Sequence, residues 1–228
     1  MDVARELAEA GAPEGVVVVA GEQTAGRGRA SHTWYSPPGQ SLYASILLRP
    51  PLTPAQAGWV TMTAALAVAE SISSPQSPVS IKWFNDVHLG GRKVCGILVE
   101  SSITGDQLDY AVLGIGLNVN PGFDDAPADV RARATSLRTA WGLHEALDCS
   151  DILMRLLAHF ESRYLHLLRT RVSPAREYAT ALETLGREVR IQSGSEIING
   201  LAVRIEEDGA LIVRSANGDR RVGLGEMI

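Results

Sequence analysis

The stretch RKVCGILVESSITGDQLDYAVLGIGLNVN, residues 92–120, decides the fold class. Residues 92–101 have the apolar pattern of a strand, TGD at 104–106 forms a turn, and residues 107–120 form a second apolar strand that ends on polar side chains. Two consecutive strands without a helix between them favour an α+β fold over a strictly alternating parallel sheet.

The flanking sequence adds helices and further strands. Strands are predicted at 16–20, 41–48 and 79–83, and a tight connection is predicted at 84–91. Helices are predicted at 2–10, from Thr53-Pro54 to about residue 73, after Ser150 as N-cap, and from Ser173-Pro174 to Gly186.

The pattern changes after residue 186. Short strand patterns follow one another there, separated by the turns SGS, EDG and ANGD, with no helical pattern between them. Such a series is typical of a small β-barrel or meander. We therefore expect two domains, at residues 1–185 and 186–228.

Composition limits the class of protein. The formal net charge of -5 over 228 residues argues against a dedicated DNA or RNA binder, since such proteins usually carry a basic excess. Cys95 and Cys149 cannot form a disulfide framework or a metal motif, and Cys95 is expected to be buried. The chain shows no leader pattern and no apolar stretch as long as a membrane span. We expect a soluble, cytoplasmic protein without a membrane partner.

The segment GEQTAGRGRA, residues 21–30, places two Gly–Arg pairs directly after an apolar strand. Arginine offers a planar set of donors that suits phosphate or carboxylate, and glycine lets the backbone close around a bound anion. This favours a loop that closes over a negatively charged ligand. A solvated basic loop, or a fragment of an RG-type RNA-binding segment, remains an alternative.

Polar residues at the strand ends form the second candidate group. Lys82, Asn85 and Asp86 lie together in KWFNDV, either as ordinary turn residues or as part of a site. Lys93 either extends its charge to solvent or faces a cleft, where it would stabilise an anionic centre. The segment GIGLNVN, residues 114–120, is either a glycine-rich strand end or a wall where a flat ligand meets the backbone, with Asn118 and Asn120 as donors and acceptors.

Common catalytic motifs are absent from the sequence. The five histidines lack metal-ligand spacing, and neither a Walker A loop nor a G-x-S-x-G elbow is present. The sequence therefore assigns no metal ligands.

Taken in order, the segments GEQTAGRGR, WYSPPGQSLYASILLRP, KWFNDV, RKVCGILVE and GIGLNVN, with the small β unit behind them, closely resemble biotin–protein ligase. The likeness runs from about residue 2 to the end of the chain. It implies a catalytic domain related to class II aminoacyl-tRNA synthetases and an SH3-like C-terminal domain. The implied reaction uses biotin, ATP and Mg²⁺ to form biotinyl-5'-AMP, and transfers biotin to a lysine of a biotin carboxyl carrier protein.

The resemblance also implies roles for individual residues. The residues that match the biotin side are Gln23, Arg27, Gly28, Arg29, Lys93, Gly96 and Leu98. Those that match the ATP and adenylate side are Trp34, Lys82, Asn85, Asp86 and Asn118. Lys93, Arg29 and Lys82 are the expected catalytic residues.

The chain departs from the family pattern in two places. The family usually has a Ser-Thr-Asn loop before the first helix, and Met1 stands roughly where that loop would end, so we expect weaker biotin binding. The family's Lys-Trp-Pro-Asn-Asp appears as KWFNDV, so Phe84 must hold by packing a turn that proline would preset. The resemblance further implies a monofunctional ligase without a DNA-binding domain and allows for a homodimer.

Three alternatives stay open on the sequence. A lipoate–protein ligase or octanoyltransferase would share the fold, although GRGR with GILVE favours biotin. A non-catalytic biotin-binding or sensor protein is disfavoured because Lys93, Arg27 and Arg29 occur together. An RNA-binding module is disfavoured by the net charge.

Overall fold

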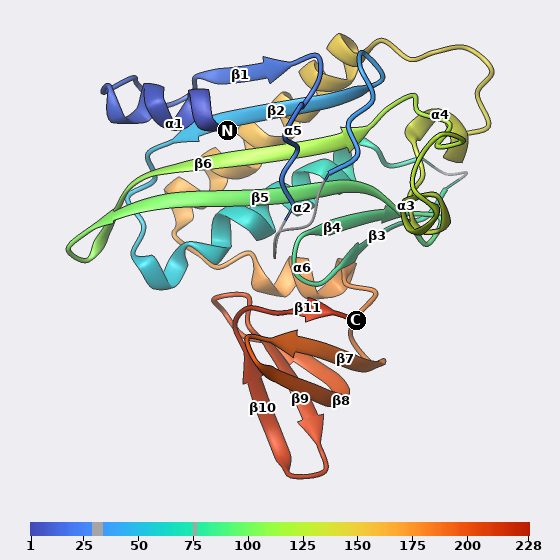
Figure 1. Cartoon of the computed structure of the whole chain (residues 1–228). Helices are drawn as coiled ribbons and strands as arrows, with labels where there is room; N and C mark the ends of the chain where they lie inside the picture. Colours follow the sequence, from blue (N-terminus) through green and yellow to red (C-terminus); the bar gives the residue numbers. More distant parts are fainter. Residues whose placement is uncertain (29–33, 75–76) are drawn as a thin grey trace.

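The computed structural model describes residues 1–28, 34–74 and 77–228, which form two antiparallel sheets with helices packed on the larger one (Figure 1). The larger sheet has the strand order β1-β2-β6-β5-β4-β3, and every neighbouring pair is antiparallel. Its strands are β1 Val17–Ala20, β2 Ser41–Leu48, β3 Val79–Lys82, β4 Asp86–Leu89, β5 Arg92–Thr104 and β6 Gln107–Asn118. The predicted α+β class is confirmed.

Strand β4 corrects one prediction. Residues 84–91, predicted as a tight connection, contain this strand, which pairs with β3 on one side and β5 on the other. Val87 and Leu89 are almost fully buried, and Gly90 and Gly91 at positive φ make the actual turn. Only two apolar residues of the strand carry the alternating pattern, which is too short a signal to outweigh the polar residues beside them.

Helices cover one face of the larger sheet. α2 (Gly58–Ser71) is buried over most of its surface, because it lies between the sheet and the long helix α5 (Cys149–Thr170). α5 contributes the predicted stripe of buried side chains, including Ile152, Leu156 and Phe160. α3 (Ala128–Arg133), α4 (Leu137–Ala140) and α6 (Ala175–Ala181) are short.

Several predicted helix ends are wrong. Asp148, not Ser150, is the N-cap of α5, where its Oδ1 accepts a hydrogen bond of 2.6 Å from the Ser150 amide. The segment after Thr53 begins as a 3-10 turn (Pro54–Gln56), and the α-helix proper starts at Gly58. α6 ends at Ala181, well before Gly186. Near each of these helix ends the sequence offers more than one residue that can cap or end a helix. It therefore predicts that the helix exists but not where it begins or ends.

On the opposite face of the sheet lie α1 (Asp2–Glu9) and the segment that follows β1. α1 packs Ala4 and Ala8 on Leu47 and Val112. The segment that follows β1 then crosses in front of β6 and β5 (Figure 1). The candidate site lies on this face, on the part of β5 and β6 between α1 and the edge strand β3.

The smaller sheet is the all-β unit that the sequence predicted. Its order is β10-β9-β8-β7-β11, from β7 Glu188–Ser193, β8 Glu196–Ile205, β9 Leu211–Ser215, β10 Gly218–Val222 and an unpredicted β11 Glu226–Met227. It docks through its turn at 206–209, where the Glu207 carbonyl accepts from Trp59 Nε1 at 2.8 Å. The Gly209 carbonyl accepts from Trp83 Nε1 at 3.0 Å.

None of the helices that the structure describes is long and apolar enough to cross a membrane.

Candidate active site

Glycines form the floor of the candidate site. Gly96 of β5 lies directly opposite Gly116 of β6, and Leu98 lies opposite Gly114. Residues that face each other across a sheet share a side, so Asp86, opposite Gly96, projects onto the same face. The three glycines bring backbone without side chains to the face of the sheet opposite α2 and α5.

Two side chains lie on this floor. A Cβ added at Gly96 would come within 2.8 Å of Trp34 Cζ3, and one at Gly116 within 3.0 Å of Trp34 Cε2. A Cβ at Gly114 would come within 2.6 Å of Met1 Sδ. A flat ring can lie against the floor because the three glycines carry no side chains, which favours the interpretation of GIGLNVN as a wall for a flat ligand.

Lys93 projects over the same floor. Its Nζ lies 2.7 Å from Asp86 Oδ1 and 5.2 Å from the centre of the Trp34 ring. The Lys93 side chain is 31% exposed, so the cation is directed to the site and not fully into solvent. The structure thus brings together Lys93 and Gly96 of β5, Asp86 of β4 and Trp34 of the segment before β2.

The turn between β3 and β4 braces the nucleotide-side candidates. Asn85 Nδ2 donates a hydrogen bond of 2.6 Å to the Ile97 carbonyl, and the Ile97 amide donates one of 3.0 Å to the Asn85 carbonyl. Lys82 lies opposite Asp86 at the end of this hairpin and so shares its face. The turn and site interpretations of KWFNDV are therefore compatible.

Asn118 is buried and bonds to a neighbouring segment. Its Nδ2 donates to the Thr135 carbonyl at 3.1 Å, and the Thr135 amide donates to the Lys93 carbonyl at 2.8 Å. These bonds connect the ends of β5 and β6 near the site. The side chain thus holds in place the strand end from which Lys93 projects.

The described part of the Gly–Arg loop is hydrogen-bonded across its base. The Trp34 amide donates to the Gly26 carbonyl at 2.9 Å, and Ser36 Oγ donates to Gln23 Oε1 at 3.2 Å. Gly28 is half-buried. Arg29, predicted as catalytic, lies outside the described residues.

Arg27 is held by two carboxylates beside the site. Its Nη2 lies 2.8 Å from Asp2 Oδ1 and 3.8 Å from Glu100 Oε1 on β5. The guanidinium of Arg27 lowers the pKa of the Asp2 carboxyl. α1 therefore connects to the loop through an ionic contact.

No cluster of three or more potential metal ligands occurs among the described residues. Asp86 supplies a carboxylate at the site, beside Lys93. Mg²⁺ is usually bound through one or two carboxylates together with substrate phosphates. The donor set thus fits a cation that arrives with a nucleotide.

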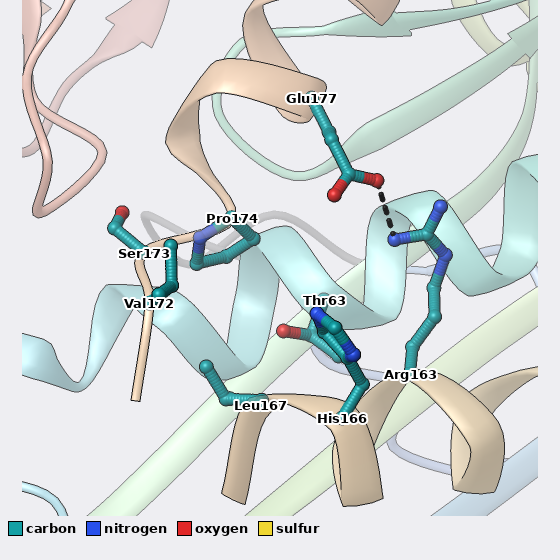
Figure 2. Close-up of a pocket in the computed structure, with 8 residues that line it drawn as sticks. All are labelled: Thr63, Arg163, His166, Leu167, Val172, Ser173, Pro174 and Glu177. Carbon is teal, nitrogen blue, oxygen red and sulfur yellow. Dashed lines mark hydrogen bonds and ion pairs between the residues drawn. The ribbon is translucent and has the colours of Figure 1, made fainter. Parts of the chain in front are cut away.

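A separate pocket lies between α2, α5 and α6 (Figure 2). Arg163 in its wall forms an ion pair of 3.1 Å with Glu177 and a second one with Glu70. None of the described residues predicted for the site lines this pocket. The pocket is formed by the helices that cover one face of the larger sheet, whereas the glycine floor lies on the other face, so it is not part of the candidate site.

The model of the Biotin/lipoate A/B protein ligase family matches residues 3–118, and that of the Biotin protein ligase C terminal domain matches residues 184–228. The chain belongs to the biotin protein ligase family. It is 33% identical over 221 residues to the biotin--[acetyl-CoA-carboxylase] ligase of Mycobacterium tuberculosis, covering 94% of this chain and 79% of that protein. It is 34% identical over 224 residues to the bifunctional ligase/repressor BirA of Bacillus subtilis, covering 96% of this chain and 67% of that protein.

A solved structure of the same family is similar over nearly the whole chain. The biotin protein ligase from Aquifex aeolicus in complex with biotin and ATP superposes with a TM-score of 0.81 and 28% identity, covering 98% of this chain and 92% of that one. The family and the fold predicted from the sequence are confirmed.

Gly114 and Gly116 complete the floor, and the sequence indicates them only as part of the GIGLNVN segment. Two further residues beside the site of this family member were not predicted. Asp2 and Glu100 hold Arg27, but nothing in the sequence relates these distant positions.

Proposed function

We propose that this chain is an ATP-dependent biotin ligase, which activates biotin as biotinyl-5'-AMP and transfers it to a lysine of a biotin carboxyl carrier protein. The observation that carries the proposal is the position of Lys93, which projects over the Gly96–Gly116 floor beside Asp86. The family membership and a homologous structure titled as a complex with biotin and ATP support the same reaction.

The first step joins two anions. A carboxylate oxygen of biotin attacks the α-phosphorus of ATP, and the bond to the β-phosphate breaks, so pyrophosphate leaves and a mixed anhydride forms. Such chemistry depends on positioning and charge stabilisation. Lys93 and Lys82, on the same face as the floor, supply positive charge, and Arg27 adds to it from the loop.

The second step breaks the anhydride. A neutral lysine amine of the carrier attacks the acyl carbon and loses a proton to solvent as the amide forms. The acyl C–O bond breaks, and AMP leaves with the oxygen that came from the biotin carboxylate. Water attacking the same carbon would waste the adenylate. A loop that closes over the floor excludes water, which explains why glycines flank the arginines.

The residues divide between two sides of the site. Those assigned to biotin are Gln23, Arg27, Gly28, Arg29, Lys93, Gly96 and Leu98. Those assigned to ATP are Trp34, Lys82, Asn85, Asp86 and Asn118, with Lys93, Arg29 and Lys82 as catalytic residues. The Trp34 ring lies over Gly96 and Gly116, so a ligand on this floor displaces it or stacks against it. Mg²⁺ held by Asp86 together with the phosphates would neutralise charge on ATP.

Lipoate is the competing substrate, because the matching family model covers biotin and lipoate ligases alike. The match to the biotin-specific C-terminal model favours biotin. In the test, the full chain is incubated with Mg-ATP, a carboxyl carrier domain and either biotin or lipoic acid. The mass of the carrier domain is then measured by mass spectrometry. The mass of one added biotin supports the proposal. Addition of lipoyl alone, or of neither acid, overturns it.

A further inference from the structure

The turn Trp83–Asn85 joins β3 to β4 outside the ladder, since Lys82 and Asp86 are the last paired residues of the hairpin. Asn85 lies in this turn and Asp86 directly follows it. The turn backbone therefore sets where both of these ATP-side candidates point.

Two side chains from much later in the sequence bond to this backbone. Tyr178 of α6 donates its hydroxyl to the Phe84 carbonyl at 2.6 Å. Thr184 accepts a hydrogen bond of 3.0 Å from the Trp83 amide through its Oγ1. The peptide units before and after the Trp83–Phe84 bond are thus each held by a side chain of the segment 178–184.

Both side chains are themselves held firmly. Tyr178 is 0% exposed and Thr184 is 3% exposed. The segment that links them runs beside β3, where the Glu183 amide donates to the Ile81 carbonyl at 2.9 Å. A hydrogen bond from a buried, rigid group restricts its partner more than one from a mobile surface group, because its own rotamers are already fixed.

The tyrosine hydroxyl can be separated from the packing of its ring. The ring belongs to the hydrophobic core, whereas the hydroxyl reaches the turn carbonyl. A phenylalanine would keep the core filled and remove the hydrogen bond to the Phe84 carbonyl. The same holds for Thr184, since valine preserves its shape and removes the acceptor.

We propose that Tyr178 and Thr184 are positioning residues for the ATP side of the site: they act through the Trp83–Asn85 backbone and do not touch substrate. This inference rests on the proposed function, because it takes Asn85 and Asp86 as ATP-side residues. It assigns to the helix before the C-terminal sheet a role in nucleotide affinity.

The test compares Tyr178→Phe and Thr184→Val with Tyr164→Phe in the full chain. Tyr164 is also a buried tyrosine, 5% exposed, but its hydroxyl bonds to Glu14, far from the turn in sequence and on another segment. KM for ATP and for biotin is measured by pyrophosphate release, ATP affinity by calorimetry, and Tm by thermal unfolding.

We expect Tyr178→Phe to raise KM for ATP by about threefold to tenfold, which is the range of one lost hydrogen bond. KM for biotin should stay within about twofold, and Thr184→Val should show the same split. Tyr164→Phe should lower Tm without changing KM for ATP. Hydrogen exchange should quicken at residues 83–86 in both turn variants.

A lower Tm with an unchanged KM for ATP in both turn variants would show a purely structural role and overturn the inference. An equal rise of both KM values would do the same. If Tyr178→Phe fails to fold, the KM values of Thr184→Val for ATP and biotin decide whether the inference holds. A wild-type chain that binds ATP but forms no biotinyl-AMP would overturn the proposed function alone. The ATP affinities of the turn variants would then still test the role of Tyr178 and Thr184. A wild-type chain that binds no ATP would overturn both.

Discussion

Replacing Lys93 with methionine tests the central element of the site. Methionine keeps an unbranched apolar stem of similar length, so the packing of the stem beside Gly96 is retained. What disappears is the ammonium group, 2.7 Å from Asp86 Oδ1. The effect on the reaction is then electrostatic.

The expected magnitude follows from the position of that charge. A carboxylate about 4 Å from Nζ gains about 4 kcal/mol at an effective dielectric constant of about 20. Lys93 is 31% exposed and already paired with Asp86, so the gain available to the reacting groups is smaller. Removal of one stabilising donor typically costs about 10²–10³ in rate, and the exposure of Lys93 favours the lower end.

The assay is pyrophosphate release with saturating biotin and Mg-ATP. Arg92→Met is the matched control, because Arg92 is the neighbouring cation on β5 and is exposed. Removing Lys93 also leaves the Asp86 carboxylate without this partner. The cycle of Lys93→Met, Asp86→Asn and the double variant separates lost attraction from new repulsion, because Asp86→Asn alone measures the role of that carboxylate. A Lys93→Met rate within about threefold of wild type, or an equal loss in Arg92→Met, would refute the role of Lys93.

Three shorter predictions concern the floor and one buried histidine. Gly96→Ala should weaken biotin binding by about tenfold or more in calorimetry, because its Cβ would stand 2.8 Å from the present Trp34 ring and occupy the floor; unchanged affinity would show that biotin lies elsewhere. Trp34→Phe should remove most of the change in tryptophan fluorescence on ligand binding, and a full signal in this variant would place the change at another indole. Burial lowers the pKa of His88, against the opposing effect of Glu183, so the unfolded chain takes up a proton that the folded chain resists. The free energy of unfolding should therefore fall as the pH drops below about 6.5, and His88→Gln should flatten that slope in urea titrations, whereas an equal slope would contradict it.

The sequence predicts much of the fold because its strong patterns are long. β2 was predicted at its observed bounds, and the hairpin of β5 and β6 was recognised from two apolar runs joined by a turn. β4 was missed because Asp86–Leu89 holds too few residues to show alternation, and its strand character comes from pairing on both sides. Tertiary contacts, which the sequence does not display, decide such elements.

Of the candidate site, the sequence predicts residues but not contacts. Lys93, Asp86 and Trp34 were predicted and meet on one face. The ion pairs of Arg27 with Asp2 and Glu100 could not be predicted, because exposed pairs depend on how the loop packs. The carrier protein as partner, Mg²⁺, a homodimer and a cytoplasmic location stay predictions.

The pairing of Gly96 with Gly116 depends on one β-bulge in the β5–β6 hairpin, close to the turn and distant from the floor. Near the turn, Thr104 lies opposite Gln107 and Ile103 opposite Leu108, and a bulge then shifts the pairing by one residue before Ser102. If the turn register continued without the bulge, Gly96 would face Ile115, and the glycines of the two strands would point to opposite sides of the sheet. With the bulge, Gly96 faces Gly116, while Ile115 and Leu117 are buried in the core beneath α2. The alignment of the glycines on one face and of the core residues on the other thus requires the same extra residue. The sequence pattern alone does not show this register.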